Sequence, residues 1–146
     1  MPFDTRSQLR QALARLSQRG LGMTCGLEIE FHIYKLQNPD HGDDLNPDHA
    51  AWPGDGPAVS MIHPGYQLLS EHWLDVCDAP SRLVPQTSQG LASPLPSLDL
   101  ELGPSQLEAV FAPPDALPAA DNIVRFPSSV LQALRRAGSH SPLVFR

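Results

Sequence analysis

Apolar and polar residues alternate along residues 23 to 36 with a period of two. One side of this segment carries Cys25, Leu27, Ile29, Phe31 and Ile33, and the other side carries Glu28, Glu30, His32 and Tyr34. Successive side chains of a β-strand point to opposite faces of its sheet. The pattern therefore predicts a strand with one buried face and one acidic face.

A second alternating segment covers residues 97 to 111. Here Leu98, Leu100, Leu102, Leu107, Ala109 and Phe111 alternate with Asp99, Glu101, Gln106 and Glu108. The residues Gly-Pro-Ser at 103 to 105 supply a turn between the two halves. This arrangement predicts two strands, or one bent strand, with the acidic side chains on a single face.

Helical spacing marks the N-terminal segment. Leu9, Ala12, Leu13 and Leu16 follow the i, i+3, i+4, i+7 pattern of one helix face. Asp4 or Thr5 is a suitable N-cap, and Gly20 is a suitable stop. We therefore expect an N-terminal helix within residues 1 to 22, whose apolar face needs a partner surface.

The middle of the chain contains shorter elements. Residues 58 to 76 predict a short extended segment, a turn at Pro64 and Gly65, and a helix from about Ser70. Residues 78 to 96 hold several prolines and predict a segment broken by them.

The C-terminal segment from 115 to 137 has apolar residues at helical spacing but contains Pro127. A proline inside a helix removes a hydrogen bond and costs roughly 3 kcal/mol. We therefore expect two helices, the second capped by Ser128 or Ser129 and ending at Gly138.

Composition places the chain in the globular class. It has 146 residues, of which 41% are hydrophobic and 18% are charged, which suits one domain or a piece of a larger protein. Residues 37 to 57 are rich in Pro, Gly and Asp and predict a long surface loop.

Charge and cysteine content exclude several classes of function. The net charge of -6 argues against a nucleic-acid partner, because such binding needs clustered Lys and Arg. Cys25 and Cys77 have no C-x-x-C spacing, so neither a disulfide framework nor a zinc ribbon is indicated. The N-terminus lacks the apolar core of a signal peptide, and no run of 18 apolar residues would span a membrane. We expect a soluble, cytoplasmic protein with no membrane partner.

The two acidic faces meet if both alternating segments belong to one sheet. Glu28, Glu30, Glu101 and Glu108 would then lie together, where carboxylates repel by several kcal/mol at roughly 4 Å. Protonation, arginine partners or divalent cations can offset this repulsion, and oxygen ligands on strands suit Mg²⁺ or Mn²⁺. The alternative on pattern alone is the solvated face of an antiparallel sheet. His32, beside Glu30, is either a ligand, a donor to one, or an ordinary polar-face histidine.

These segments resemble motifs of the glutamine synthetase family. "CGLEIEF" is similar to the family's G-x-E-x-E-F strand, and "ELGPSQLE" is similar to its E-x-x-P-G-Q-x-E segment, with Ser105 where glycine is usual. Residues 119 to 146 resemble the helix and strand that lead to the family's Lys-Pro motif. We identify residues 23 to 146 as a partial catalytic domain of this type.

The resemblance implies an α+β fold, with a partial curved antiparallel sheet backed by helices. It also implies that Glu28 binds one divalent ion, Mg²⁺ or Mn²⁺, and that Glu30, Glu101 and Glu108 bind a second. The family joins a glutamate-like acid to ammonia or an amine, with ATP as co-substrate, to give a γ-glutamyl amide in nitrogen metabolism. In this chemistry one ion offsets charge on the phosphates, and the other anchors the carboxylate that is activated.

The resemblance does not cover a whole active site. One helix precedes residue 23, where the family has a β-grasp domain, and the family's histidine ligand, a further glutamate and its arginines follow the matched range. We therefore assign no catalytic residue and expect the chain alone not to turn over. Exposed strand edges would favour association, including a homo-oligomer. The alternatives are a non-catalytic metal-binding or oligomer-partner remnant and an unrelated acidic-faced binding module.

Overall fold

The computed structural model describes residues 3–37, 57–66, 68–89 and 94–142. In chain order its elements are α1 (Thr5–Ser17), β1 (Leu27–His32), β2 (Tyr34–Leu36), β3 (Val59–Met61), α2 (Glu71–Val76), α3 (Asp78–Ser88), β4 (Ser97–Leu100), β5 (Gln106–Phe111), α4 (Ala116–Arg136) and β6 (Ser139–His140). The loop predicted at 37 to 57 lies, except for its two end residues, outside the described residues. Among the described helices, none has the length and apolar character needed to cross a membrane.

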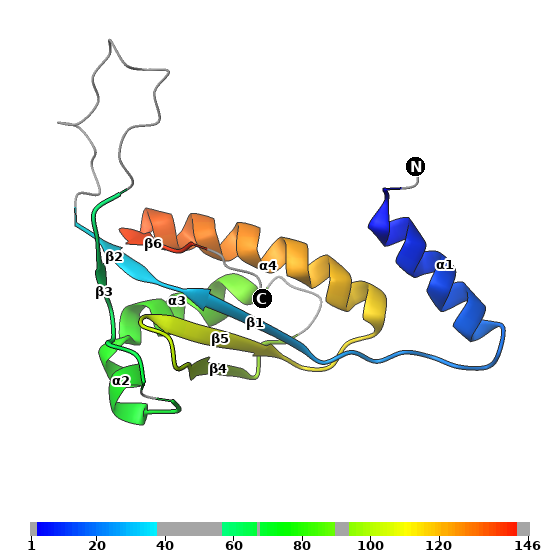
Figure 1. Ribbon diagram of the computed structural model, residues 1–146, viewed down its shortest axis with the longest axis horizontal. Helices are drawn as coiled ribbons and strands as arrows, with labels where there is room; N and C mark the ends of the chain where they lie inside the picture. Colours follow the sequence, from blue (N-terminus) through cyan, green and yellow to red (C-terminus); the bar gives the residue numbers. More distant parts are fainter. Residues whose placement is uncertain (1–2, 38–56, 67, 90–93, 143–146) are drawn as a thin grey trace, which may run out of the picture.

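The described strands form two small antiparallel sheets (Figure 1). One sheet has the order β1-β5-β4 and the other has the order β3-β2-β6. The prediction of two strands within 97 to 111 is confirmed. The strand predicted within 23 to 36 is confirmed but divided, because the chain passes from the first sheet to the second at Ile33. The buried Ile33 donates its N–H to the carbonyl of Ser105 at 2.8 Å, so this crossing point is fixed to the turn before β5.

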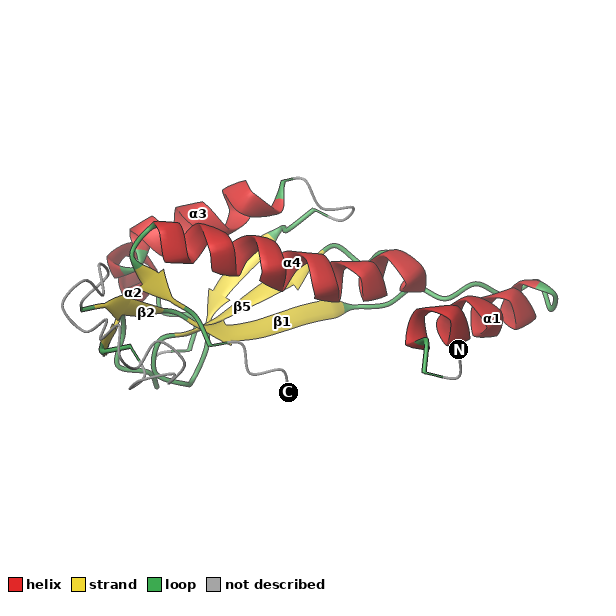
Figure 2. Cartoon of the chain, turned by 90° about the horizontal axis from the view of Figure 1, so that it is seen from above, coloured by secondary structure: helices red, strands yellow, loops and turns green. Residues whose placement is uncertain are grey.

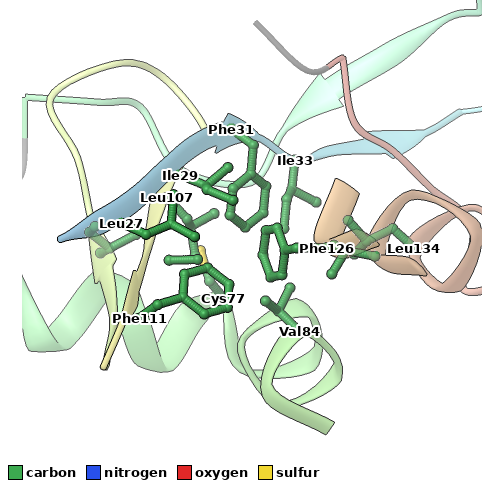
Figure 3. Close-up of a cluster of buried hydrophobic side chains, with 13 residues drawn as sticks. Leu27, Ile29, Phe31, Ile33, Cys77, Val84, Leu107, Phe111, Phe126 and Leu134 are labelled. Atoms are coloured by element: carbon green, nitrogen blue, oxygen red, sulfur yellow. The ribbon is translucent and has the colours of Figure 1, made fainter. Parts of the chain in front are cut away.

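Helices cover one face of the β1-β5-β4 sheet, so the fold is α+β as expected (Figure 2). Leu27, Ile29 and Phe31 of β1 point into the resulting core and are buried. Figure 3 shows Phe126 of α4 within this cluster. Its ring meets Phe31 and Phe111 edge to face, with centroid separations of 5.7 and 5.2 Å. The opposite face of the sheet is left to the acidic side chains.

The prediction of two helices around Pro127 is wrong, because α4 is one continuous helix. Its buried positions include Phe126, Pro127, Val130 and Leu134, so the proline lies on the face that packs against the core. Burial of these side chains stabilises the helix by roughly 1.5–3 kcal/mol for each large residue, which together exceeds the cost of the proline. Ser128 does not cap a second helix, since its hydroxyl donates to the Val124 carbonyl at 3.0 Å.

The prediction of a proline-broken segment from 78 is also wrong for residues 78 to 88, which form helix α3. Pro80 occupies the first turn, where the missing N–H would have no partner within the helix. Pro85 lies inside the helix, next to the fully buried Val84. As in α4, packing of an apolar face outweighs the local cost, and α3 and α4 lie side by side over the sheet (Figure 2).

The N-terminal helix α1 is confirmed and extends away from the rest of the fold (Figure 1). Asp4 is its N-cap and accepts the N–H of Ser7 at 3.0 Å. None of its residues is fully buried. It meets α4, where the Arg6 guanidinium donates to both carboxylate oxygens of Asp121 at 2.7 and 3.0 Å. Such a paired contact at the surface orients α1 more than it stabilises it.

The central place of Phe126 gives a test of the fold. We predict that Phe126→Ala lowers the free energy of unfolding by about 3–5 kcal/mol, because it removes a fully buried ring and leaves a cavity. Val124→Ala, at a position of the same helix that is 69% exposed, should change it by less than about 0.5 kcal/mol. Urea denaturation followed by circular dichroism measures both, and equal effects of the two changes would contradict this description of the core.

Candidate functional site

Three carboxylates lie in one row across the open face of the β1-β5-β4 sheet. In the strand register, Glu30 of β1 is opposite Glu108 of β5, and Glu108 is opposite Asp99 of β4. Directly opposed side chains of antiparallel strands have Cβ atoms about 4.5–5.5 Å apart. The register therefore brings Glu30 and Glu108 together, as the sequence predicts, and adds Asp99, which the predicted ligand set does not contain.

Glu101 and Glu28 border this row. Glu101 follows β4 directly, and its N–H donates to the Gln106 carbonyl at 3.1 Å, so it continues the ladder beside β5. Glu28 precedes Glu30 by two residues, lies on the same face of β1 and is exposed. The four glutamates predicted to converge therefore share one face of one sheet.

The pKa of Glu108 is raised in this arrangement. Its pKa is raised from 4.5 to about 7, first by partial burial, then by a hydrogen bond with Glu101, and then by the charges of Glu101, Glu28 and Glu30. A proton shared between Glu108 and Glu101 neutralises one unit of negative charge at the centre of the cluster. A divalent cation bound by the same oxygens would also offset this negative charge, with both carboxylates ionised.

The donor set fits a hard divalent cation in its chemistry. All the acidic side chains offer oxygen only, which suits Mg²⁺ or Mn²⁺. Within the ranges that the structure describes, however, no three His, Cys, Asp or Glu side chains form a compact ligand group. Binding would therefore require rotation of the carboxylates on a fixed backbone, and the ligand assignments remain predictions.

Gln106 connects Glu30 to the turn that precedes β5. Its side-chain N–H donates to one carboxylate oxygen of Glu30, and its side-chain carbonyl accepts the Gly103 N–H at 2.8 Å. One carboxylate oxygen of Glu30 is thereby held in place.

Ser105 holds the same turn in an unusual backbone conformation. Its φ is +59°, in the left-handed region that favours glycine, which accounts for the glycine usual at this place in the resembled motif. The fully buried Ser105 hydroxyl accepts the Ile62 N–H at 2.9 Å, and its backbone N–H donates to the His63 carbonyl at 3.1 Å. The serine thus ties the turn to residues 62 and 63.

His63 completes this connection and was not anticipated as a partner of the site. It is buried, and burial lowers its pKa, so the ring is neutral at pH 7. Nδ1 accepts the Gly65 N–H at 3.2 Å, which leaves Nε2 to donate to the Gln106 carbonyl at 3.1 Å. No local sequence signal identifies this role, because Gln106 is 43 residues away in the chain.

A surface cleft of about 420 Å³ adjoins the acidic cluster. Its lining consists of Glu30, His32, Tyr66, Leu102, Gly103, Pro104 and Gln106. Glu30 belongs to both features, so the cleft opens directly beside the carboxylates.

Known proteins with similar sequences identify the family. Residues 2–144 match the model of the family "Glutamine synthetase, catalytic domain". The chain is similar to gamma-glutamylanilide synthase from Acinetobacter sp., with 32% identity over 143 residues. This alignment covers 96% of the chain and 28% of the relative, so the chain spans less than a third of the relative's length.

Solved structures agree on the fold. A structure described as a GmaS/ADP complex superposes with a TM-score of 0.62 and 21% identity over 94% of this chain and 28% of that one. Plasmodium falciparum glutamine synthetase superposes with a TM-score of 0.64 and 15% identity over 94% of this chain and 30% of that one. The acidic two-strand motif, the fold and the family match converge: the chain belongs to the glutamine synthetase family and represents part of its catalytic domain.

Proposed function

We propose that the acidic face of the β1-β5-β4 sheet is the metal-holding part of an ATP-dependent ligase that makes γ-glutamyl amides. In this proposal Glu28 holds one Mg²⁺ or Mn²⁺ ion, and Glu30, Glu101 and Glu108 hold the other. The observation that carries it is the strand register that places these carboxylates on one face, where partial burial, a hydrogen bond with Glu101 and the neighbouring charges raise the pKa of Glu108 to about 7. A solvated strand face would keep such charges apart, whereas a cation site needs them together.

The protein's own groups have defined tasks in this reaction class. The carboxylates position the ions, and Gln106 fixes the orientation of Glu30 through its side-chain N–H. Bound divalent ions would offset the charge of the ATP phosphates and anchor the acid that is activated. The hydrogen bonds of Ser105 and His63 keep the turn before β5 in register, so Glu101 and Glu108 stay on the same face.

The substrates follow from the family and its relatives. We propose ATP, a glutamate-like acid and ammonia or an amine as the reactants, with the cytoplasm as the location and a homo-oligomer as the assembly. Similarity to a protein named gamma-glutamylanilide synthase supports an organic amine, rather than ammonia, as the nitrogen substrate in this proposal. Because the chain spans 28% of that relative, cation binding tests the proposal more directly than turnover does.

Mn²⁺ titration gives the first test. We predict that the chain binds Mn²⁺ and that Glu30→Gln or Glu108→Gln weakens binding at least about tenfold, because loss even of a group that supports a ligand costs 10- to 100-fold. Asp78→Asn is the matched control, since Asp78 lies on α3 and pairs with Arg82 at the surface. Electron paramagnetic resonance of free Mn²⁺ measures the affinity. No saturable binding, or equal weakening by Asp78→Asn, would favour a solvated acidic face.

The raised pKa of Glu108 gives the second test. Its folded pKa of about 7 lies above the ordinary 4.5, so the folded state binds the proton more tightly. This group therefore contributes stability below about pH 4.5 that is lost as the pH rises to about 7. Screening by water at this partly exposed position reduces the effect to the order of 1 kcal/mol, or about 3 °C in Tm.

The measurement compares wild-type and Glu108→Gln melting curves in EDTA between pH 4.5 and 8. We expect the difference in Tm between the two proteins to change by about 3 °C between pH 4.5 and about 7 and to be nearly constant from there to pH 8. Comparison with the variant removes the contribution of Asp4 and Asp121, whose pKa values are lowered and whose effect has the opposite sign at lower pH. A constant difference across the whole range would show that Glu108 titrates normally.

A further inference from the structure

The outer edge of β1 carries backbone groups that pair with no described strand. β1 is the end strand of the order β1-β5-β4, with β5 on one side only (Figure 1). Directly after β1, the Ile33 N–H donates to the Ser105 carbonyl at 2.8 Å, so the backbone groups of the odd-numbered residues bond toward β5. The direction of the backbone groups alternates along an antiparallel strand. Glu28, Glu30 and His32 therefore direct their N–H and C=O groups to the open edge.

The edge of β4, on the other side of the sheet, is already used. The Tyr66 N–H donates to the Leu102 carbonyl at 2.8 Å, and the Leu69 N–H donates to the Leu100 carbonyl at 3.2 Å. Proline, lysine and bulges commonly protect an edge strand from further pairing, and β1 is a regular strand with neither residue in its sequence LEIEFH. The β1 edge is therefore the place in this sheet where a further strand can add.

Two acidic side chains decide which strand can add. Residues directly opposite each other on antiparallel strands lie on the same face, with Cβ atoms about 4.5–5.5 Å apart. Side chains opposite Glu28 and Glu30 would therefore stand beside their carboxylates. β1, β5 and β4 contain no Lys or Arg, and in the part of the chain that the structure describes neither glutamate forms an ion pair. Lys or Arg at alternate positions of an added strand would supply the missing positive charge.

A second copy of this chain fits the edge poorly. On a twofold axis, the antiparallel register with the longest overlap sets Glu30 opposite Glu30 of the second copy. A shift by one pair toward the start of the strand sets Glu28 opposite Glu30. Like charges that face each other across two strands are destabilising. The glutamates therefore act against self-pairing through this edge and favour a basic strand.

We propose that the outer edge of β1 binds an extended segment of another protein, one that carries Lys or Arg at alternate positions. The backbone of this segment pairs with Glu28, Glu30 and His32, and its basic side chains lie beside the two carboxylates. Its intervening side chains lie on the core face, where β1 is already buried, so small or β-branched residues suffice there. The inference goes beyond the proposed function, because the pairing needs neither a bound cation nor a nucleotide.

Binding of a short synthetic peptide that alternates lysine with threonine tests the inference. Fluorescence anisotropy of the labelled peptide in EDTA gives the Kd. A peptide with glutamate in place of lysine, and one of the same composition with its lysines grouped together, serve as comparison ligands. We expect the alternating lysine peptide to bind at least about tenfold more tightly than either, because only this peptide places a positive charge opposite each glutamate.

Backbone methylation separates strand pairing from attraction of charge alone. In the proposed register the backbone N–H groups of the lysines face β1, and those of the threonines face away. Methylation of the lysine backbone nitrogens should therefore weaken binding at least about tenfold, since it removes hydrogen bonds to the edge. Methylation of the threonine backbone nitrogens makes the same chemical change on the outer side and should alter the Kd by less than about twofold.

A charge-reversal variant locates the peptide on the sheet. Glu28→Lys, at an exposed position, should weaken binding of the lysine peptide at least about fivefold. Asp78→Lys makes the same charge change on the surface of α3 and should leave the Kd within about twofold. Hydrogen exchange gives an independent readout, in which the amides of Glu28, Glu30 and His32 should exchange at least about tenfold more slowly when the peptide is bound.

The outcomes are distinct from those of the Mn²⁺ titration, because all of these measurements are made in EDTA. Equal affinity of the two methylated peptides, equal weakening by Glu28→Lys and Asp78→Lys, or no protection of the three edge amides would each overturn the inference. Concentration-dependent protection of the same amides without peptide would also overturn it, since the edge would then bind a second copy. Peptide binding as expected without saturable Mn²⁺ binding would count against the metal site alone.

Discussion

Repulsion between carboxylates on one face of a three-stranded sheet is the constraint on which the candidate site depends. The register of β1 against β5 and of β5 against β4 places Glu30, Glu108 and Asp99 in one row. The other face of the same strands is fully committed to the core through Phe31, Leu107 and their neighbours. The acidic groups therefore cannot turn away without breaking the apolar packing, and their charge has to be offset where they stand.

A proton on Glu108 and a divalent cation are two alternative ways to offset the negative charge of these carboxylates. In the proposed metal site, a pKa of about 7 would make the proton and the cation compete near neutral pH, with the proton favoured in acid and the cation favoured in base. The turn at Ser105 also bears on the charge of Glu108, because it fixes the start of the strand that carries this residue. Its hydroxyl and the buried His63 hold the start of β5, so the backbone that carries Glu108 cannot shift to relieve the repulsion.

Much of this architecture could be predicted from the sequence, because period-two alternation in β1 and β5 is a local signal with one dominant cause. Asp4 as the cap of α1 and the turn at 103 to 105 are local in the same sense. The errors came at Pro85 and Pro127, where a local rule met tertiary packing: both prolines lie in helices that cover the sheet. The free-energy cost of one proline in a helix can be estimated from the sequence, but the burial of Phe126 and Val130, which offsets that cost, is known only from the fold.

In the candidate site, too, the residues that could be predicted are those with a local sequence signal. Spacing within each strand placed Glu28 beside Glu30, the assumption of a shared sheet joined them to Glu101 and Glu108, and the family resemblance supplied the ligand roles of all four. The supporting groups could not be predicted, because His63 and Ile62 meet the turn at Ser105 across a separation of 43 residues. The contact between the His32 ring and the Pro104 carbonyl likewise joins residues 72 apart in the chain. Such contacts exist only once the strands are paired.

Paramagnetic broadening of backbone amide resonances by substoichiometric Mn²⁺ tests the central claim most directly, since it locates the cation without any need for turnover. If the carboxylates share a divalent ion, the amides of residues 28–32, 101–103 and 105–108 should broaden first, while those of α1 remain sharp. Broadening that is uniform over the acidic surface, or that is strongest around Asp75 of α2 and Asp78 of α3, would contradict the account.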